Sequence, residues 1–91
     1  MRILVLHSAY GLRPAVHDRV QRLREAGHQA HAPDLYAGAT ADTLVNALAL
    51  RDAAGRKALM QRALAEAQTY APDALLGFSL GAAIAQRIAV Q

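Results

Sequence analysis

The sequence lacks cysteine entirely, has few aromatic residues and contains no long apolar run. Among its 91 residues there is no Cys, one Phe and three Tyr. The absence of cysteine excludes disulfides, thiolate metal sites and a cysteine nucleophile. No stretch approaches the roughly 18 consecutive apolar residues of a membrane-spanning helix. The apolar run at residues 3–6 is also too short for a secretory signal. We therefore expect a cytoplasmic protein that does not bind membranes.

Charge and composition are typical of one small globular domain, residues 1–91. The chain carries ten Lys and Arg against seven Asp and Glu, a formal net charge of +3, and is 54% hydrophobic. No basic run is interleaved with aromatic residues, so nucleic acid is not an expected partner. We interpret the basic side chains as solvated helix faces, notably those of Arg19, Arg22, Arg24, Arg56, Lys57 and Arg62.

Strand-like and helix-like segments alternate along the chain. Three segments have the apolar pattern of strands: 3–6, 28–32 and 75–78. Four segments have helical spacing: from Pro14 to a stop at Gly27, from Asp42 to an interruption at Gly55, 56–70 and 82–90. In the second of these helices, one side is formed by Leu44, Val45 and Leu48.

This alternation predicts an α/β fold with a parallel sheet. Right-handed crossovers then give the strand order 2-1-3, with the first helix on one face and the later helices on the other. Ligands of such sheets bind at the carboxyl ends of the strands, here between the first and third strands. The third strand should form an exposed sheet edge, through which we expect the chain to self-associate.

The most informative stretch is Gly77-Phe78-Ser79-Leu80-Gly81, a G-x-S-x-G sequence between an expected strand and an expected helix. That context is typical of a nucleophile elbow. The glycines leave room where the strand and helix approach each other. The serine stands at the helix N-terminus, where N–H groups favour negative charge. The alternative is a glycine-rich turn with an incidental serine. Against it, the only two serines, Ser8 and Ser79, both fall at expected strand ends.

A serine nucleophile needs a base and hydrogen-bond donors for the oxyanion. The expected donors are the backbone N–H groups of Leu80 and of Ala9, which lies in the loop after the first strand. Tyr10 and Tyr36 are candidates for lining the pocket. His7 is the one histidine near the expected site and is a candidate base. Its alternative role is that of a strand-end residue hydrogen-bonded to backbone.

No pattern in the sequence predicts a metal or a cofactor. His17, His28 and His31 have no spacing that suggests a metal site, and we expect them to be structural. Asp34, which follows the second expected strand, is expected to cap the next turn.

The chain resembles the dienelactone hydrolase family of the α/β-hydrolase superfamily in three segments, HSAYGLRP, REAGHQAHAPDLYAG and GFSLGAA. By this resemblance, Ser79 stands at the nucleophile position, and Ala9 and Leu80 are the oxyanion donors. From their place in the loop at the same edge of the sheet, we expect Ser8 and Tyr10 to contact the substrate. The founding members have a cysteine nucleophile and, at the position of Ser8, a glutamate that contacts it. These two differences favour a general carboxylic-ester or thioester hydrolase over an enzyme for dienelactone itself.

The superfamily places a catalytic acid and then a histidine after the nucleophile in the chain. None of the twelve residues after Ser79 is Asp, Glu or His. We therefore expect a partial α/β-hydrolase domain that is catalytically incomplete by itself. Two alternatives of other classes stay open. One is a small flavodoxin-like module that binds an anion or phosphate at the elbow. The other is a non-catalytic protein that pairs through its sheet edge.

Overall fold

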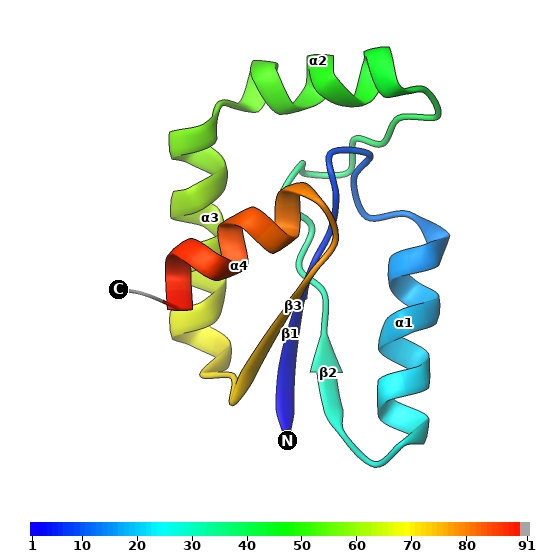
Figure 1. Ribbon diagram of the computed structural model, residues 1–91, viewed down its shortest axis with the longest axis vertical. Helices are drawn as coiled ribbons and strands as arrows, with labels where there is room; N and C mark the ends of the chain where they lie inside the picture. The colour runs from blue at the N-terminus through cyan, green and yellow to red at the C-terminus, as the bar shows by residue number, and fades with distance from the viewer. Residues whose placement is uncertain (90–91) are drawn as a thin grey trace.

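The computed structural model of the protein describes residues 1–89, which form a parallel sheet surrounded by helices (Figure 1). The strands are β1 (Arg2–Leu6), β2 (Gln29–His31) and β3 (Ala74–Gly77). The helices are α1 (Pro14–Glu25), α2 (Leu44–Ala54), α3 (Arg56–Tyr70) and α4 (Leu80–Ala89). Within this part of the chain, no helix has both the length and the apolar character needed to cross a membrane.

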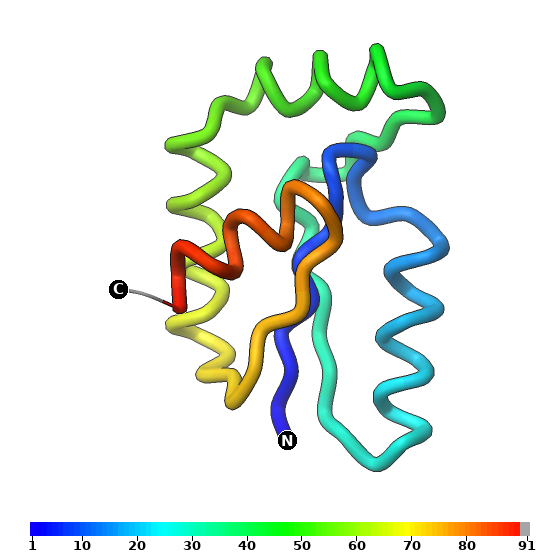
Figure 2. Tube along the Cα trace, viewed as in Figure 1, coloured from blue at the N-terminus to red at the C-terminus, as the bar shows by residue number. Residues whose placement is uncertain are grey.

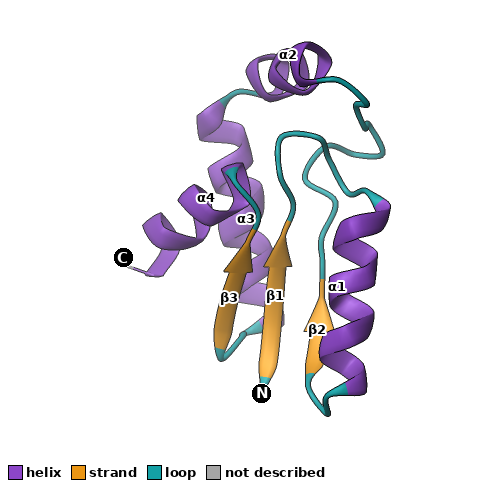
Figure 3. Cartoon of the chain, turned by 45° about the vertical axis from the view of Figure 1, so that its right-hand side comes forward, coloured by secondary structure: helices purple, strands orange, loops and turns teal. Residues whose placement is uncertain are grey.

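The sheet has the predicted strand order, β2-β1-β3, and both pairs are parallel. In the register, Leu4 of β1 lies opposite His31 on one side and Leu75 on the other. All three strands therefore point the same way, and their carboxyl ends meet at the edge of the sheet beneath α2 (Figure 3). That edge is where the fold places a ligand.

Alternate residues of β1 supply the cores on the two faces of the sheet. Ile3 and Val5 pack against α1 through Val16 and Val20. Leu4 and Leu6 point the other way and join a cluster with Leu59 and Ala63 of α3 and Ile84 and Ala85 of α4. Because β1 is buried on both faces, it is a continuous apolar run rather than an alternating one. The prediction of helices on both faces is confirmed.

Helix α2 departs from the prediction in its start and in what it covers. Its N-cap is Thr43, whose Oγ1 accepts the Asn46 N–H at 3.2 Å, so the helix begins at Leu44 rather than at Asp42. Leu44 and Val45 are 59% and 77% exposed, and Ala47 is the residue of this helix that is buried. The reason is that α2 lies across the carboxyl edge of the sheet instead of packing on a face (Figures 1 and 3).

The predicted bounds of α3, residues 56–70, are confirmed, and the strands and α4 differ from their predicted bounds by one or two residues. Strand β3 ends at Gly77, so Phe78 belongs to the turn, and α4 begins at Leu80 rather than at residue 82. Val90, the predicted end of that helix, lies outside the described residues. Within residues 1–89, β3 is a sheet edge, because no other strand pairs with its outer side. Self-association through that edge stays a prediction.

Candidate active site

Ser79 occupies a sharp turn between β3 and α4. Its φ is 53°, in the left-handed region that a side chain with a Cβ rarely adopts, and its side chain is exposed. The Phe78 N–H donates to the Leu6 carbonyl at 3.0 Å, and the Gly81 N–H donates to the Phe78 carbonyl at 2.9 Å. These two bonds close the turn tightly and leave Ser79 at its tip. Strained backbone of this kind clusters at active sites and also occurs in ordinary turns, as at Ala37 and Ala71, whose φ is 52°.

The two glycines of the elbow are required by close backbone approach. A Cβ added at Gly81 would lie 2.7 Å from the His7 carbonyl oxygen and closer still to that of Leu6. A Cβ added at Gly77 would overlap the backbone of Gly81. The first turn of α4 therefore rests directly on the ends of β1 and β3. The sequence motif is explained by this geometry.

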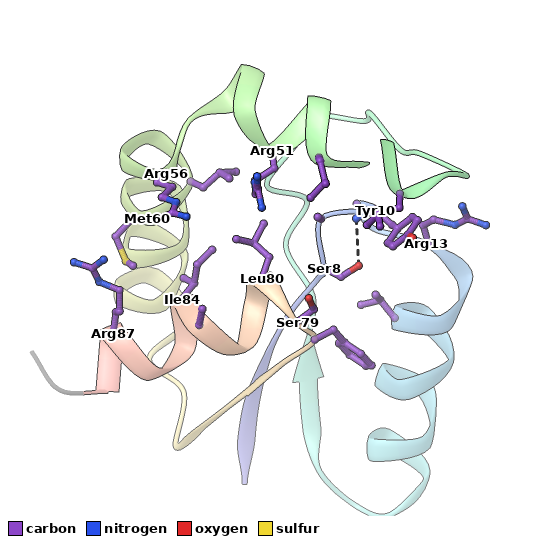
Figure 4. A pocket seen from close by; sticks show the side chains of 18 of the residues that line it. Ser8, Tyr10, Arg13, Arg51, Arg56, Met60, Ser79, Leu80, Ile84 and Arg87 are labelled. Carbon is purple, nitrogen blue, oxygen red and sulfur yellow. Dashed lines mark hydrogen bonds between the residues drawn. The ribbon is translucent and has the colours of Figure 1, made fainter. Parts of the chain in front are cut away.

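The loop after β1 is shaped by its own serine and by a neighbouring segment. Ser8 Oγ accepts the Tyr10 N–H at 3.2 Å, which is the bond drawn in Figure 4. The Gly11 N–H donates to the Ser8 carbonyl at 3.0 Å, and the Tyr10 carbonyl accepts the Ala41 N–H at 3.0 Å. The bond between the Ala41 N–H and the Tyr10 carbonyl joins this loop to the segment that leads into α2, and the two segments lie side by side in Figure 2. The loop is thus held in one shape at the carboxyl end of β1.

Among the backbone N–H groups near this turn that donate no hydrogen bond within residues 1–89 are those of Ala9 and Leu80. Leu80 is the first residue of α4, where N–H groups have no partner inside the helix. The side chains of both residues pack in one apolar cluster with Ala47 of α2. Two free donors are thereby carried by residues of the same small cluster.

A cavity of about 1090 Å³ opens at this edge of the sheet, between α2 and α4 (Figure 4). The residues predicted as nucleophile, oxyanion donors and substrate contacts all line it: Ser8, Ala9, Tyr10, Ser79 and Leu80. They come from two loops about 70 residues apart in the chain, and the parallel sheet brings them together. Their catalytic and binding roles stay predictions.

The sequence matches the dienelactone hydrolase family over residues 1–91. The protein belongs to this family. The resemblance found in the three sequence segments is confirmed over the whole chain. Membership supports a hydrolase of the α/β-hydrolase superfamily. No curated protein and no solved structure gives a significant match.

In this hydrolase-family chain, His7 is a structural residue and is not available as a base. It is fully buried and does not line the cavity. Its Nε2 accepts the Leu35 N–H at 2.9 Å, and its Nδ1–H donates to the Ser8 carbonyl at 2.7 Å. Both ring nitrogens are therefore occupied by backbone groups. Of the two roles considered for His7, the structure supports the backbone-bonded one.

We expect His7→Ala to lower the free energy of unfolding by about 3 kcal/mol. The substitution leaves the Leu35 N–H and the Ser8 carbonyl without their partner, and each such loss costs about 1–3 kcal/mol. Urea denaturation measures the change. His17→Ala is the matched control, because His17 is exposed on α1 and its removal should change stability by less than about 0.5 kcal/mol. Equal stability of the two variants would contradict the assignment.

Tyr36 does not line the cavity, contrary to the expectation from the sequence. It is buried in the core between the sheet and α3, with its ring centroid 5.0 Å from that of His7. Its hydroxyl has no hydrogen-bond partner among the described residues. Burial raises the pKa of Tyr36, while Arg51 lowers that pKa and Asp52 raises it. Tyr36 thus belongs to the packing beneath the site.

Asp34 caps the turn after β2, as predicted, and takes no part in the cavity. Its two carboxylate oxygens accept the N–H groups of Tyr36 at 2.9 Å and Gly38 at 2.8 Å. Among residues 1–89, no Asp, Glu or His side chain lines the cavity. Nor does this part of the chain contain a group of three such residues that could hold a metal ion. The described site therefore has a hydroxyl and free donors but no Asp, Glu or His to act as a general base.

The cationic wall of the cavity is the feature that the sequence interpretation missed. The basic residues that line it are Arg13, Arg51, Arg56, Lys57 and Arg87. Two of them, Arg56 and Lys57, were interpreted as part of a solvated helix face. The signal that could have found them is the position of Arg51, Arg56 and Lys57 on either side of Gly55, where α2 turns into α3 over the site.

Proposed function

We propose that this chain supplies the nucleophile and the oxyanion donors of a serine hydrolase that acts on carboxylic esters or thioesters. One observation carries the proposal. Ser79 sits exposed on a strained strand-to-helix turn and lines the same cavity as Ala9 and Leu80, two residues whose backbone N–H groups donate no hydrogen bond within residues 1–89. An exposed hydroxyl and unpaired donors on residues of one cavity are features suited to acyl transfer.

In the proposed reaction, Ser79 Oγ attacks the acyl carbon, and the carbonyl electrons move to the oxygen. The N–H groups of Ala9 and Leu80 donate to this oxyanion, and the N-terminal end of α4 adds its positive dipole. The alcohol or thiol then leaves with a proton, and water hydrolyses the acyl-serine. The proton transfers need a base from outside residues 1–89, because the described cavity wall contains no Asp, Glu or His.

A fluorophosphonate probe tests the proposed nucleophile. We expect slow labelling of the chain at Ser79, identified by mass spectrometry of the digested protein, and no labelling of Ser79→Ala. The urea-denatured chain is a control, because an unfolded serine is not activated. Ser8→Ala is the second control, since Ser8 is the only other serine and its loss must leave the label on Ser79. A label on Ser8, or one that persists in Ser79→Ala, would overturn the proposal.

A further inference from the structure

Most basic side chains of the protein have an evident structural partner. Six form a hydrogen bond or an ion pair within residues 1–89: Arg2, Arg13, Arg22, Arg24, Arg51 and Arg62. The other four form neither within the same residues: Arg19, Arg56, Lys57 and Arg87. Three of these four line the cavity that contains Ser79. The unpaired positive charge is thus concentrated at the candidate site rather than spread over the surface.

These three cations sit at one end of the cavity. Arg56 and Lys57 form the first turn of α3, and Arg87 lies on α4. Figure 4 shows Arg56 and Arg87 on either side of Met60, at the end away from Ser79. The wall between the two ends includes the apolar side chains of Leu80 and Ile84, together with Arg51, which is paired with Asp52. The cavity therefore has a reacting end at Ser79, a mostly apolar middle and an end with three unpaired cations.

The stability of α3 does not explain this placement. Positive side chains in a first turn oppose the helix dipole, and the first turn of α3 contains no acidic residue to offset them. No Asp or Glu of residues 1–89 lines the cavity either. Arg56, Lys57 and Arg87 are all exposed and free to contact a ligand. Their common property is that they face the same cavity with no counter-charge.

We infer that this end of the cavity binds a phosphate monoester group, so that the substrate is an ester or thioester with a phosphate at the far end of an apolar chain. A phosphate monoester carries about −1.5 to −2 charges at pH 7. It offsets three cations better than a carboxylate does, with its single charge. Guanidinium groups also match phosphate oxygens through paired hydrogen bonds. The inference that the substrate is an ester or thioester rests on the proposed function, whereas the inference of a phosphate site rests on the three cations alone.

Binding of matched hexyl compounds to the full chain tests the inference. Hexyl phosphate, heptanoate and hexanol share the same six-carbon chain and differ in head group. By calorimetry at pH 7 we expect hexyl phosphate to bind at least about tenfold more tightly than heptanoate, and hexanol to bind most weakly. The affinity for hexyl phosphate should rise as the pH increases from 5 to 7, because the second ionisation of its phosphate has a pKa of about 6. Equal or tighter binding of heptanoate would overturn the inference.

Substitutions test whether hexyl phosphate binding depends on these three cations or on the positive charge of the chain as a whole. Arg56→Gln, Lys57→Gln and Arg87→Gln should each weaken hexyl phosphate binding about two- to fivefold, as exposed ion pairs do, and the triple variant about tenfold or more. Arg19→Gln is the matched control, since Arg19 is equally unpaired but lies on α1 away from the cavity, and it should leave the affinity unchanged. Unchanged hexanol binding by the triple variant shows that the cavity is intact. An equal effect of Arg19→Gln would refute the site.

The two proposals fail independently. If the phosphate preference is present and fluorophosphonate does not label Ser79, the phosphate site stands and the nucleophile is wrong. If Ser79 is labelled and hexyl phosphate has no advantage, the nucleophile stands and the phosphate site is wrong. Ser79→Ala should bind hexyl phosphate as tightly as the parent chain, because it removes no charge from the cationic end.

Discussion

Replacing Gly81 with alanine is expected to remove most of the stability of the protein, about 3–5 kcal/mol. The new Cβ would meet the carbonyl oxygens of Leu6 and His7, so that either α4 or the end of β1 must move. Both obstacles are backbone atoms, and no side-chain rotation can relieve the overlap. Effects of this size are rare for single substitutions and accompany forced backbone shifts. Urea denaturation measures the loss of stability as a lower urea concentration at the midpoint of unfolding, with an unchanged dependence of the unfolding free energy on urea.

Gly38→Ala is the control that separates steric overlap from backbone strain. Gly38 has a φ of 96°, so alanine is strained there too, but its Cβ would meet nothing within 4 Å. We expect it to cost only about 1–2 kcal/mol, the usual penalty for a left-handed residue. Gly77→Ala should behave like Gly81→Ala, because its Cβ would overlap the backbone of α4. A Gly81→Ala variant as stable as Gly38→Ala would show that α4 can lift away from the sheet.

The burial of β1 on both faces and the end of α1 could be predicted because residues close together in the sequence determine them. The apolar run of β1 indicates burial on both faces, which requires helices on both sides of a parallel sheet. Helix α1 stops where predicted because Gly27 has a φ of 94° and donates to the Arg24 carbonyl, while His28 donates to that of Leu23. These signals depend on residues adjacent in sequence.

The position of α2 could not be predicted, because its pattern shows a helix but not what the helix faces. Leu44 and Leu48 are apolar at helical spacing, and the expected reason was burial against the sheet. They line the cavity instead, because the chain crosses the carboxyl edge before it turns at Gly55 into α3. A cavity wall and a core both select apolar side chains, so periodicity alone does not distinguish them.

In the candidate site, too, features fixed by local residues could be predicted and features that depend on distant residues could not. The elbow was predictable because Gly77, Ser79 and Gly81 are each fixed by the local turn. The role of His7 depends on Leu35, which is 28 positions away along the chain, and the cationic end of the cavity combines residues from α3 and α4. Contacts of this kind arise from the tertiary fold, and no short motif encodes them.

The chain of 91 residues is expected to be a very poor esterase, although Ser79 is its proposed nucleophile. In a well-studied serine hydrolase, loss of the serine or the histidine alone lowers turnover about 10⁶-fold, and a residual 10³–10⁴-fold acceleration over water comes from the oxyanion hole and binding. The described cavity wall has the serine and free donors but no Asp, Glu or His, and His7 is buried and bonded through both nitrogens. Hydrolysis of p-nitrophenyl acetate measures the turnover, and Ser79→Ala should change it little.

Added imidazole provides the complementary test, because the missing component is a base. Neutral imidazole is small enough to enter a cavity of about 1090 Å³ and can accept the Ser79 proton. We expect imidazole to accelerate fluorophosphonate labelling of the parent chain and to have no effect on Ser79→Ala, which separates action at the site from action in solution. Fast Ser79-dependent turnover without imidazole would instead show that a base lies within this chain. His7 would then have to give up its bond to Leu35 or Ser8 to act, and His7→Ala would abolish the turnover.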